Sequence, residues 1–558
     1  MNYLDKPWLK SYKLGPYALD HSLAGIAPKP VNYYLDEAAA RYPTQTAILF
    51  KGSSLKYHQL KDRVDRLAGA LVKLGLQPGE RVCLYLPNCV EYLLMYWAVL
   101  KAGGAVVSTS ILRKGEGLRY EVGSSGSRIL CCQEDRLDLV QSMCDKFDIE
   151  HILVTSNEGY NRAEIQKSLP NGTIELRTLL ETATPLTKPV DIDPQVDLCE
   201  LAFTGGATGV PKGVMISHAN RYSSIMRLMP WLMKPMLSGI SGKSSVLIAI
   251  PMFHTYGNFI QITAVCLGLR MILLPDPRDT EAMEAAILEH RPFLIPGVPT
   301  QFMRLKDAGL KRINSMLYSG AAPLPQEVAE AIQGKTGMPI SEGYGLTETA
   351  TASHINLSAF GKITGFMARA KPGIGVPTPD TECQLLDPQS GKAVPFGEPG
   401  EVVLRGPQVM RGYWPEVGSG LTEDGWLHTG DVGVMDEDGY FQIVDRLKDM
   451  VNVSGMKVYT TEVDEVLFKH PAVQIAAAFG VPDKDIPGSE RVMVVVQLKP
   501  GQQGKVSDDD IRDYCRQHLP PYMVPKYVEF REEMPLTVSE KVFKRILREE
   551  AIGKLEKG

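Results

Sequence analysis

The sequence predicts an α/β protein with a large N-terminal domain and a small α+β C-terminal domain, and three observations support this class. The chain has 558 residues, more than a single hydrophobic core usually holds. Helical and strand-like apolar patterns alternate through its first half, which is typical of parallel sheets covered by helices on both faces. From residue 371 onward, short apolar runs are separated by Gly, Pro and Asp turns, which indicates a β-rich subdomain.

The first elements follow a helix–turn–strand order. Apolar side chains recur at helical spacing from Leu60 to Leu74, and Gly75 ends this helix. After a turn at 77–80, the apolar run 82–86 predicts a buried strand. The same criteria predict a helix at 92–100 and strands at 105–107, 129–132, 152–154, 246–250 and 271–274.

The β-rich subdomain is expected at 371–445, with strands at 401–404 and 440–444. The charged segment that follows Asp445 has no periodicity and is the best candidate for a domain boundary. We therefore expect a large domain at 1–447 and a small domain at 448–558. Helices are predicted in the small domain at 460–469, 508–518 and 542–550.

Composition excludes several classes of protein. The net charge of −5 and the scattered basic residues give no reason to expect a nucleic-acid partner. Nine cysteines, among them the adjacent Cys131 and Cys132, suit buried strands in a reducing cytosol better than a disulfide framework. No signal sequence or membrane-spanning apolar run is apparent. A cytoplasmic protein is expected, with peripheral contact at the inner face of the membrane left open.

The Met-rich stretch 226–236 has two interpretations. Methionine fills irregular gaps in cores, so ordinary packing is the first of them. The second is an adaptable lip for an apolar substrate or a membrane surface.

The strongest chemical signal is the loop from Phe203 to Gly213. Its four glycines let backbone N–H groups turn toward an anion, its threonines add donors, and Lys212 adds positive charge. These features suit a polyphosphate. The pattern is not a Walker loop, because Lys212 precedes a glycine rather than Ser or Thr.

Two further stretches carry groups that suit a nucleotide. The run Glu342–Thr349 combines an aromatic ring, hydroxyls and the Glu348 carboxylate, which can stack on a base and hold Mg²⁺ beside phosphate. The run 425–431 ends in Asp431, which can accept bonds from ribose hydroxyls, and Arg446 can neutralise phosphate. Each stretch alone could be an ordinary turn.

Together and in order, these stretches resemble the adenylate-forming superfamily, which holds acyl-CoA synthetases, peptide-synthetase adenylation domains and luciferases. The resemblance covers nearly the whole chain. It rests on six segments, which are 204–213, 319–323, 344–348, 426–431, 445–449 and 453–455. Such a protein activates a carboxylic acid with ATP and passes the acyl group to a thiol.

The resemblance implies roles for the matched residues. Thr347, Glu348 and Lys541 would be catalytic, and Glu348 with Thr204 would bind Mg²⁺. ATP and AMP would be bound by Thr204, Gly205, Gly206, Ala207, Thr208, Gly209, Lys212, Gly320, Ala321, Ala322, Pro323, Glu342, Gly343, Tyr344, Gly345, Thr347, Asp431, Arg446 and Lys541. The acid pocket would be lined by Phe253, His254, Thr255, Gly257, Gly320 and Gly345. The hinge and the coenzyme A path would involve Lys448, Ser454 and Gly455.

The same resemblance implies that the C-terminal domain is mobile and rotates about Lys448 between the two half-reactions. Two residues depart from the pattern of the family. Ala207 stands where Thr or Ser is common, and Glu540 stands where a glycine usually precedes the catalytic lysine. Lys544 is therefore a rival to Lys541.

The acid is the most open part of the prediction. His254 takes the position where amino-acid-activating domains carry an aspartate, so an amino acid would lack its counter-charge. The opening 6–12 and the Thr-Gly-Gly loop look most like bacterial medium- to long-chain fatty acyl-CoA synthetases, and free coenzyme A is the expected acceptor. An aryl-CoA ligase is the alternative, followed by a luciferase-type oxidase and a non-catalytic nucleotide-binding protein. A homodimer is left open.

Overall fold

A computed structural model describes residues 2–14, 17–23, 25–144, 148–158, 165, 169–204, 211–226, 237–310, 312–358, 361, 365, 371–537 and 541–557. The segments outside these ranges include residues 205–210 of the predicted phosphate loop (203–213), most of the Met-rich stretch (227–236) and Glu540. None of the helices in the described ranges combines the length and the hydropathy that crossing a bilayer requires.

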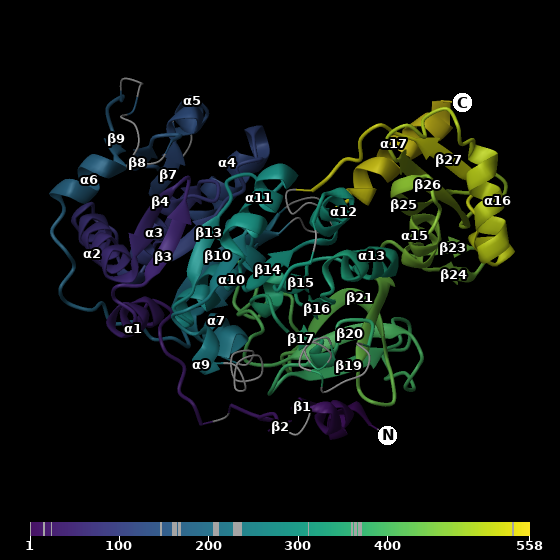
Figure 1. Cartoon of the computed structure of the whole chain (residues 1–558), viewed down its shortest axis with the longest axis horizontal. Coiled ribbons are helices and arrows are strands. Elements are labelled where there is room, and N and C mark those ends of the chain that lie inside the picture. Colours follow the sequence, from purple (N-terminus) through teal and green to yellow (C-terminus); the bar gives the residue numbers. More distant parts are fainter. Residues whose placement is uncertain are drawn as a thin grey trace.

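Two large sheets form the centre of the N-terminal part (Figure 1). The first has the strand order β11-β10-β6-β5-β7-β8-β9 and is parallel except for the antiparallel pair β10–β11. Its strands are β5 (Arg81–Tyr85), β6 (Ala105–Ser108), β7 (Ile129–Gln133), β8 (His151–Thr155), β9 (Thr173–Glu175), β10 (Leu198–Thr204) and β11 (Lys212–Ser217). Cys131 and Cys132 are buried and free on β7, as predicted.

The second sheet has the order β18-β17-β16-β15-β14-β12-β13-β3-β4. Its six central strands are parallel, whereas β4, β17 and β18 add antiparallel edges. The strands are β3 (Thr46–Phe50), β4 (Ser53–Lys56), β12 (Ser245–Ile248), β13 (Arg270–Leu273), β14 (Leu294–Gly297), β15 (Met316–Ser319), β16 (Ile340–Tyr344), β17 (His354–Ile355) and β18 (Val376–Pro377).

Helices cover these sheets, and some are buried between them. Helices α3 and α10 are apolar around most of their circumference, and nearly all of their residues are buried. A helix that is apolar on all sides is expected to be enclosed by other elements. The helices of this part are α1 (Tyr33–Arg41), α2 (Tyr57–Lys73), α3 (Val90–Lys101), α4 (Gly115–Ser125), α5 (Leu137–Cys144), α6 (Leu176–Thr182), α7 (His218–Met226), α9 (Leu237–Ile240), α10 (Thr255–Cys266), α11 (Thr280–His290), α12 (Pro299–Asp307) and α13 (Gln326–Thr336).

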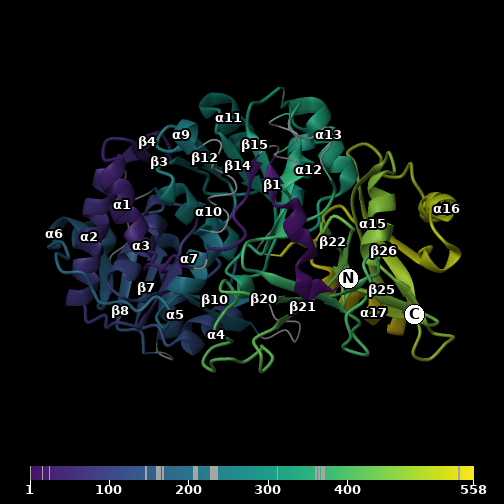
Figure 2. The same ribbon diagram turned by 90° about the horizontal axis from the view of Figure 1, so that it is seen from below.

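The β-rich subdomain is a four-stranded antiparallel sheet that runs β19 (Glu382–Leu386), β20 (Gly400–Arg405), β21 (Leu427–Met435) and β22 (Phe441–Arg446). Its first strand begins later than the predicted 371. The earlier strand β18 does not join it, because β18 pairs with β17 at the edge of the nine-stranded second sheet. The N-terminal 3-10 helix η2 (Pro7–Ser11) lies close to this subdomain (Figure 2). There Trp8 is buried with its ring centroid 6.0 Å from that of Phe441.

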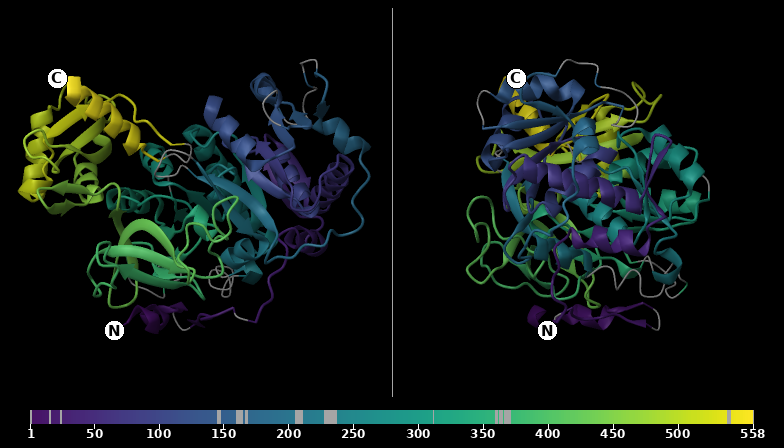
Figure 3. Two further views of the ribbon diagram at one scale, coloured as in Figure 1. Left: turned by 180° about the vertical axis from the view of Figure 1, so that it is seen from behind. Right: turned by 90° about the vertical axis from the view of Figure 1, so that its left-hand side faces the viewer.

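The C-terminal part is α+β, as predicted, and has apolar clusters of its own. Figure 3 shows it at the opposite end of the molecule from β8 and β9. It comprises β23 (Val451–Val453), β24 (Met456–Val458), α15 (Thr460–Phe468), β25 (Val473–Pro482), β26 (Glu490–Leu498), α16 (Asp508–His518), β27 (Tyr527–Phe530) and α17 (Lys544–Lys557). The helix predicted at 542–550 begins at Lys544, because Val542 pairs as a β-bridge with Leu536.

Candidate active site

The candidate site lies beyond the carboxyl ends of parallel strands β15 and β16 in the nine-stranded second sheet. This is where open α/β sheets usually bind ligands. Strands β15 and β16 are neighbours in register, with Ser319 opposite Glu342. The segments that follow them, 320–323 and 345–349, are therefore side by side. These are the adenine-framing and Thr-Glu segments of the prediction, and the topology brings them together.

The loop after β15 is held by Glu342. Its Oε1 accepts a hydrogen bond of 3.1 Å from the backbone N–H of Leu324, just beyond Pro323. Burial raises the pKa of the Glu342 carboxyl to about 7. Ala321 and Ala322 complete the turn, and Ala321 has the left-handed φ of 74°.

The strand β16 ends in a close backbone approach. A Cβ atom at Gly345 would lie 1.2 Å from the carbonyl oxygen of Thr351, so no other residue fits there without moving the loop that carries Thr347 and Glu348. A Cβ atom at Gly343 would lie 1.7 Å from the hydroxyl oxygen of Tyr318. Gly345 is thus required by the nearby backbone, whereas a side chain at position 343 would have to displace the Tyr318 ring.

Asp431, Tyr344 and Arg446 form one hydrogen-bonded group. Asp431 and Arg446 are register partners on β21 and β22, and Arg446 Nε lies 2.9 Å from Asp431 Oδ1. The Tyr344 hydroxyl donates to Asp431 Oδ2 at 2.7 Å. Burial, followed by the charge of Asp431, raises the pKa of Tyr344 well above its usual value. The β-rich subdomain thereby supplies a fixed carboxylate beside the aromatic ring.

Glu348 lies on the 3-10 helix η4 (Thr347–Thr349), in the segment that follows β16. Its Oε1 accepts a hydrogen bond of 3.0 Å from the hydroxyl of Tyr413, and its carbonyl oxygen accepts one of 2.8 Å from the N–H of Met410. Tyr413 belongs to none of the motifs found in the sequence. The structure adds it to the site.

The described ends of the phosphate loop are Thr204 and Lys212, which are register partners on β10 and β11. The Lys212 Nζ lies 4.7 Å from the ring centroid of Tyr413 and thus on the same side of the site as Glu348. The predicted roles of Gly205, Gly206, Ala207, Thr208 and Gly209 concern residues outside the described ranges and stay predictions.

The C-terminal part brings Lys541 into the same site. Burial, followed by the positive charge of Arg446, lowers the pKa of Lys541 to about 8, and Asp431, Lys448 and Glu348 also act on it. The rival Lys544 is engaged elsewhere, with its Nζ 2.8 Å from both Asp464 Oδ2 and the Thr460 hydroxyl. Lys541 and not Lys544 therefore lies in reach of the Asp431 group, and the catalytic role of Lys541 stays a prediction.

This depressed pKa predicts a pH dependence. Lys541 carries its positive charge below a pKa of about 8 and loses it as the pH rises through that value. We expect kcat/KM for ATP in acyl-adenylate formation to fall above that pH, since this parameter reports groups of the free enzyme. The check is a pH profile of the wild type and of Lys541→Arg, whose guanidinium stays charged. If the alkaline fall persists unchanged in Lys541→Arg, another group causes it.

The predicted acid-pocket residues lie at the start of α10. His254 is the N-cap residue, and its Nδ1 accepts a bond of 3.3 Å from the N–H of Tyr256. Burial, with the positive charge of Lys541 as a further cause, lowers the pKa of His254 to about 3, so the imidazole is neutral. A Cβ atom at Gly257 would lie 2.1 Å from the carbonyl oxygen of Pro251. His254 thus caps helix α10, in addition to standing between Phe253 and Thr255 in the predicted acid pocket.

A buried ion pair beneath the site also escaped the sequence analysis. Arg221 on α7 is fully buried, and its Nη2 lies 2.6 Å from Glu200 Oε2 on β10. The same guanidinium donates to the Thr255 hydroxyl at 3.1 Å and to the carbonyl oxygen of Ala350 at 2.7 Å. It therefore links the start of α10 to the segment that follows Glu348.

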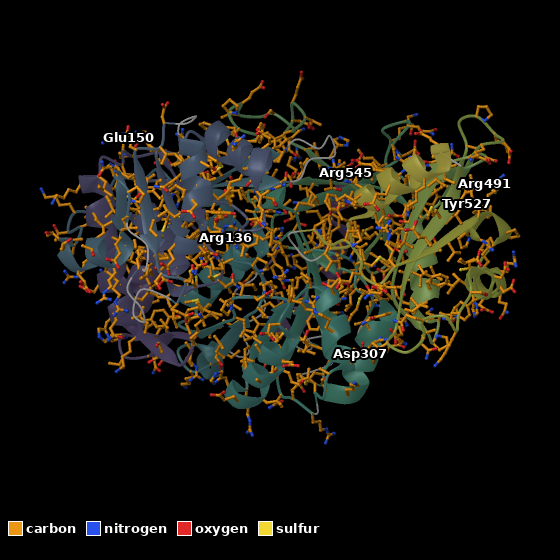
Figure 4. All side chains as sticks on the ribbon, turned by 90° about the horizontal axis from the view of Figure 1, so that it is seen from above. Arg136, Glu150, Asp307, Arg491, Tyr527 and Arg545 are labelled. Atoms are coloured by element: carbon orange, nitrogen blue, oxygen red, sulfur yellow. The ribbon has the colours of Figure 1, made fainter. Side chains whose placement is uncertain are left out.

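The hinge and coenzyme A candidates belong to different segments, since Lys448 follows β22 and residues 454–455 lie between β23 and β24. Lys448 is close enough to Arg446 for that charge, after burial, to lower its pKa, and the charge of Arg545 adds to the effect. Figure 4 shows Arg545 at the junction of the C-terminal part with the rest of the chain. Ser454 and Gly455 form the turn between β23 and β24, a hairpin that packs on β26 of the C-terminal part. In this arrangement they are not joined to the Asp431 group.

Comparison with known proteins decides the family. A family model described as AMP-binding enzyme matches residues 35–414, and one described as AMP-binding enzyme C-terminal domain matches residues 462–541. The chain belongs to the AMP-binding enzymes. This membership confirms the resemblance to adenylate-forming enzymes. The predicted boundary at 447 lies in the gap between these two matched ranges. The boundary itself stays a prediction.

Individual relatives agree with the predicted class. A long-chain-fatty-acid–CoA ligase of Bacillus subtilis (strain 168) is 35% identical over 573 residues and covers 98% of each chain. A feruloyl-CoA synthase of an Amycolatopsis species is 31% identical, over 91% of this chain and 96% of its own. Among solved structures, the anthranilate CoA ligase AuaEII in complex with anthranoyl-AMP has a TM-score of 0.83 and 25% identity, over 95% of this chain and 98% of its own. The predicted α/β fold with a large and a small part is confirmed.

Proposed function

We propose that this protein is an ATP-dependent, AMP-forming acid–CoA ligase whose acid is a long-chain fatty acid. The observation that carries the proposal is the meeting of Asp431, Tyr344, Glu348 and Lys541 in one site, in a chain similar over nearly its whole length to a long-chain-fatty-acid–CoA ligase. The medium-chain range that the sequence left open is covered by the same experiment below.

The first half-reaction joins the acid to AMP. The acid carboxylate attacks the α-phosphorus of ATP, the acyl-adenylate forms, and pyrophosphate leaves with the electron pair of the broken P–O bond. Asp431 would accept bonds from the ribose hydroxyls, and Tyr344 would stack on the adenine. Lys541 would place a positive charge where negative charge builds up in the transition state.

Magnesium fits this site. Among the described residues no three carboxylate, imidazole or thiol groups gather into a metal site. Mg²⁺ on a nucleotide needs no such cluster, because one or two carboxylates and the substrate phosphates usually hold it. Glu348, with Thr204, would be that protein contribution. The ion, when bound, would neutralise negative charge on the polyphosphate.

The second half-reaction transfers the acyl group. The sulfur of coenzyme A attacks the acyl carbonyl carbon, the thioester forms, and AMP leaves as the anhydride bond breaks. Ser454 and Gly455 would border the path of the thiol arm after rotation of the part beyond Lys448. Rotation would serve both steps, because they need different groups at one place.

The runner-up is an aryl-CoA ligase, favoured by the similarity to a feruloyl-CoA synthase. The fatty-acid proposal has stronger support, since the long-chain relative is more similar and covers more of the chain. A luciferase-type oxidase or a non-catalytic protein has less support from these relatives. A cytoplasmic location, membrane contact and a homodimer remain predictions.

A panel of acids tests the proposal. Coenzyme A thioester and AMP are measured with octanoate, laurate, palmitate, benzoate and ferulate at matched concentrations. We expect kcat/KM to rise by roughly fourfold per methylene from octanoate until the pocket is filled, because each buried CH₂ contributes about 0.8 kcal/mol. Faster turnover of benzoate or ferulate would establish the aryl alternative. Release of ADP instead of AMP would refute the proposed reaction.

A further inference from the structure

Tyr413 is fixed in place by its backbone. Residues 411–414 extend the sheet along β11, with the N–H of Met215 donating to the carbonyl of Gly412 at 3.0 Å and the N–H of Trp414 donating to the carbonyl of Gly213 at 2.7 Å. Tyr413 itself forms a β-bridge with Val214. It therefore stands directly beside the strand that begins at Lys212.

The Tyr413 side chain contacts two groups of opposite charge. Its hydroxyl donates to Glu348 Oε1 at 3.0 Å, and its ring centroid lies 4.7 Å from the Nζ of Lys212. In the same segment, the backbone N–H of Met410 donates to the backbone carbonyl oxygen of Glu348 at 2.8 Å. One short segment thus contacts both the proposed metal carboxylate and the lysine of the phosphate loop.

We propose that Tyr413 is a positioning residue that sets the Glu348 carboxylate and the Lys212 ammonium, apart from each other, toward the polyphosphate of ATP. This inference rests on the proposed function, because it takes Glu348 as the carboxylate that holds magnesium. It assigns to Tyr413 a task in nucleotide binding, not in the acid pocket.

The physical reason is that the two charges must stay available. A lysine and a glutamate in direct contact would neutralise each other and compete with phosphate and metal. The aromatic ring offers Lys212 a favourable but weaker contact, which phosphate can displace. The hydroxyl bond engages one oxygen of Glu348, and a carboxylate keeps further lone pairs for a metal ion or its water.

Two variants separate the two contacts. Tyr413→Phe removes the hydroxyl and keeps the ring, whereas Tyr413→Leu removes both. The matched control is Tyr440→Phe, because Tyr440 also lies beneath a lysine, with Lys371 Nζ 4.6 Å from its ring centroid, but outside the site. Binding of ATP to each purified protein is measured by calorimetry, once with Mg²⁺ and once with EDTA, together with the melting temperature without nucleotide.

We expect Tyr413→Phe to bind ATP with Mg²⁺ about tenfold more weakly than the wild type, since a hydrogen bond to a charged group is lost. Its affinity for ATP in EDTA should stay within about twofold of the wild type. Tyr413→Leu should weaken binding under both conditions. Tyr440→Phe should bind like the wild type.

The outcomes keep this inference apart from the proposed function. If the wild type releases AMP with a fatty acid but Tyr413→Phe binds ATP with Mg²⁺ as tightly as the wild type, the positioning role is overturned. Equal weakening of Tyr413→Phe with Mg²⁺ and with EDTA also overturns it. A wild type that binds ATP but releases no AMP with any acid refutes the proposed function. Should Tyr413→Leu fail to fold, Tyr413→Phe alone decides.

Discussion

Glu348→Gln is expected to slow acyl-adenylate formation by about a hundredfold or more, because losing a metal contact removes several kcal/mol of transition-state stabilisation. Glutamine keeps the shape of the side chain and an oxygen that can accept from Tyr413, so only the charge changes. The measurement is single-turnover formation of acyl-adenylate without coenzyme A. Part of the loss should return at high Mg²⁺ concentration.

Glu289→Gln is a suitable control for this change, since Glu289 is a largely exposed glutamate at the end of α11. It should adenylate at the rate of the wild type. If Glu348→Gln also adenylates at the rate of the wild type, Glu348 has no part in metal binding. Tyr413 would then have no metal carboxylate to position.

Lys541→Ala and Lys448→Pro are expected to separate the two half-reactions. Lys541→Ala should lower acyl-adenylate formation by about two to three orders of magnitude, as for other groups that stabilise charge in a transition state. Given preformed acyl-adenylate and coenzyme A, it should still form thioester at close to the normal rate. Lys448→Pro should do the reverse, because proline fixes φ at the proposed hinge. Quenched-flow measurement of each step checks both variants.

Lys544→Ala is the informative comparison, because Lys544 holds Asp464 and Thr460 and not the site. Removing it breaks a partly buried pair, so a lower melting temperature and equal loss in both steps are expected. Loss of adenylation alone in Lys544→Ala, with a normal Lys541→Ala, would show that the two lysines are assigned the wrong way round. Equal damage to both steps in Lys541→Ala and Lys448→Pro would argue against domain rotation.

The regular parts of the fold were predictable because they depend on local patterns. The apolar runs at 129–132 and 152–154 are buried parallel strands, as β7 and β8 show. The antiparallel pair β10–β11 was not predicted, since a Gly-rich loop joins its strands and periodicity does not give strand direction. The late start of α17 was missed because Val542, an apolar residue at helical spacing, forms a bridge instead.

The site was predictable where a motif carries it and not where tertiary contact does. Asp431 and Tyr344 were named from separate motifs, and the structure joins them at 2.7 Å. Tyr413 stands in a segment without a recognisable pattern, and its partners Glu348 and Lys212 are far away in the sequence. The pair Glu200 and Arg221 was hidden for the same reason. Glu200, a charged residue within the otherwise apolar run 198–203, was the only signal that could have pointed to this pair, since Arg221 stands in a polar segment.

Fatty-acid-dependent exchange of labelled pyrophosphate into ATP, measured without coenzyme A, reports the proposed first step alone, because only reversible formation of an acyl-adenylate links the acid to that exchange. We expect exchange that requires both the long-chain acid and Mg²⁺, and that is nearly absent in Lys541→Ala. Exchange that is equal with and without acid, or no exchange in a protein that still binds ATP and forms thioester, would contradict it.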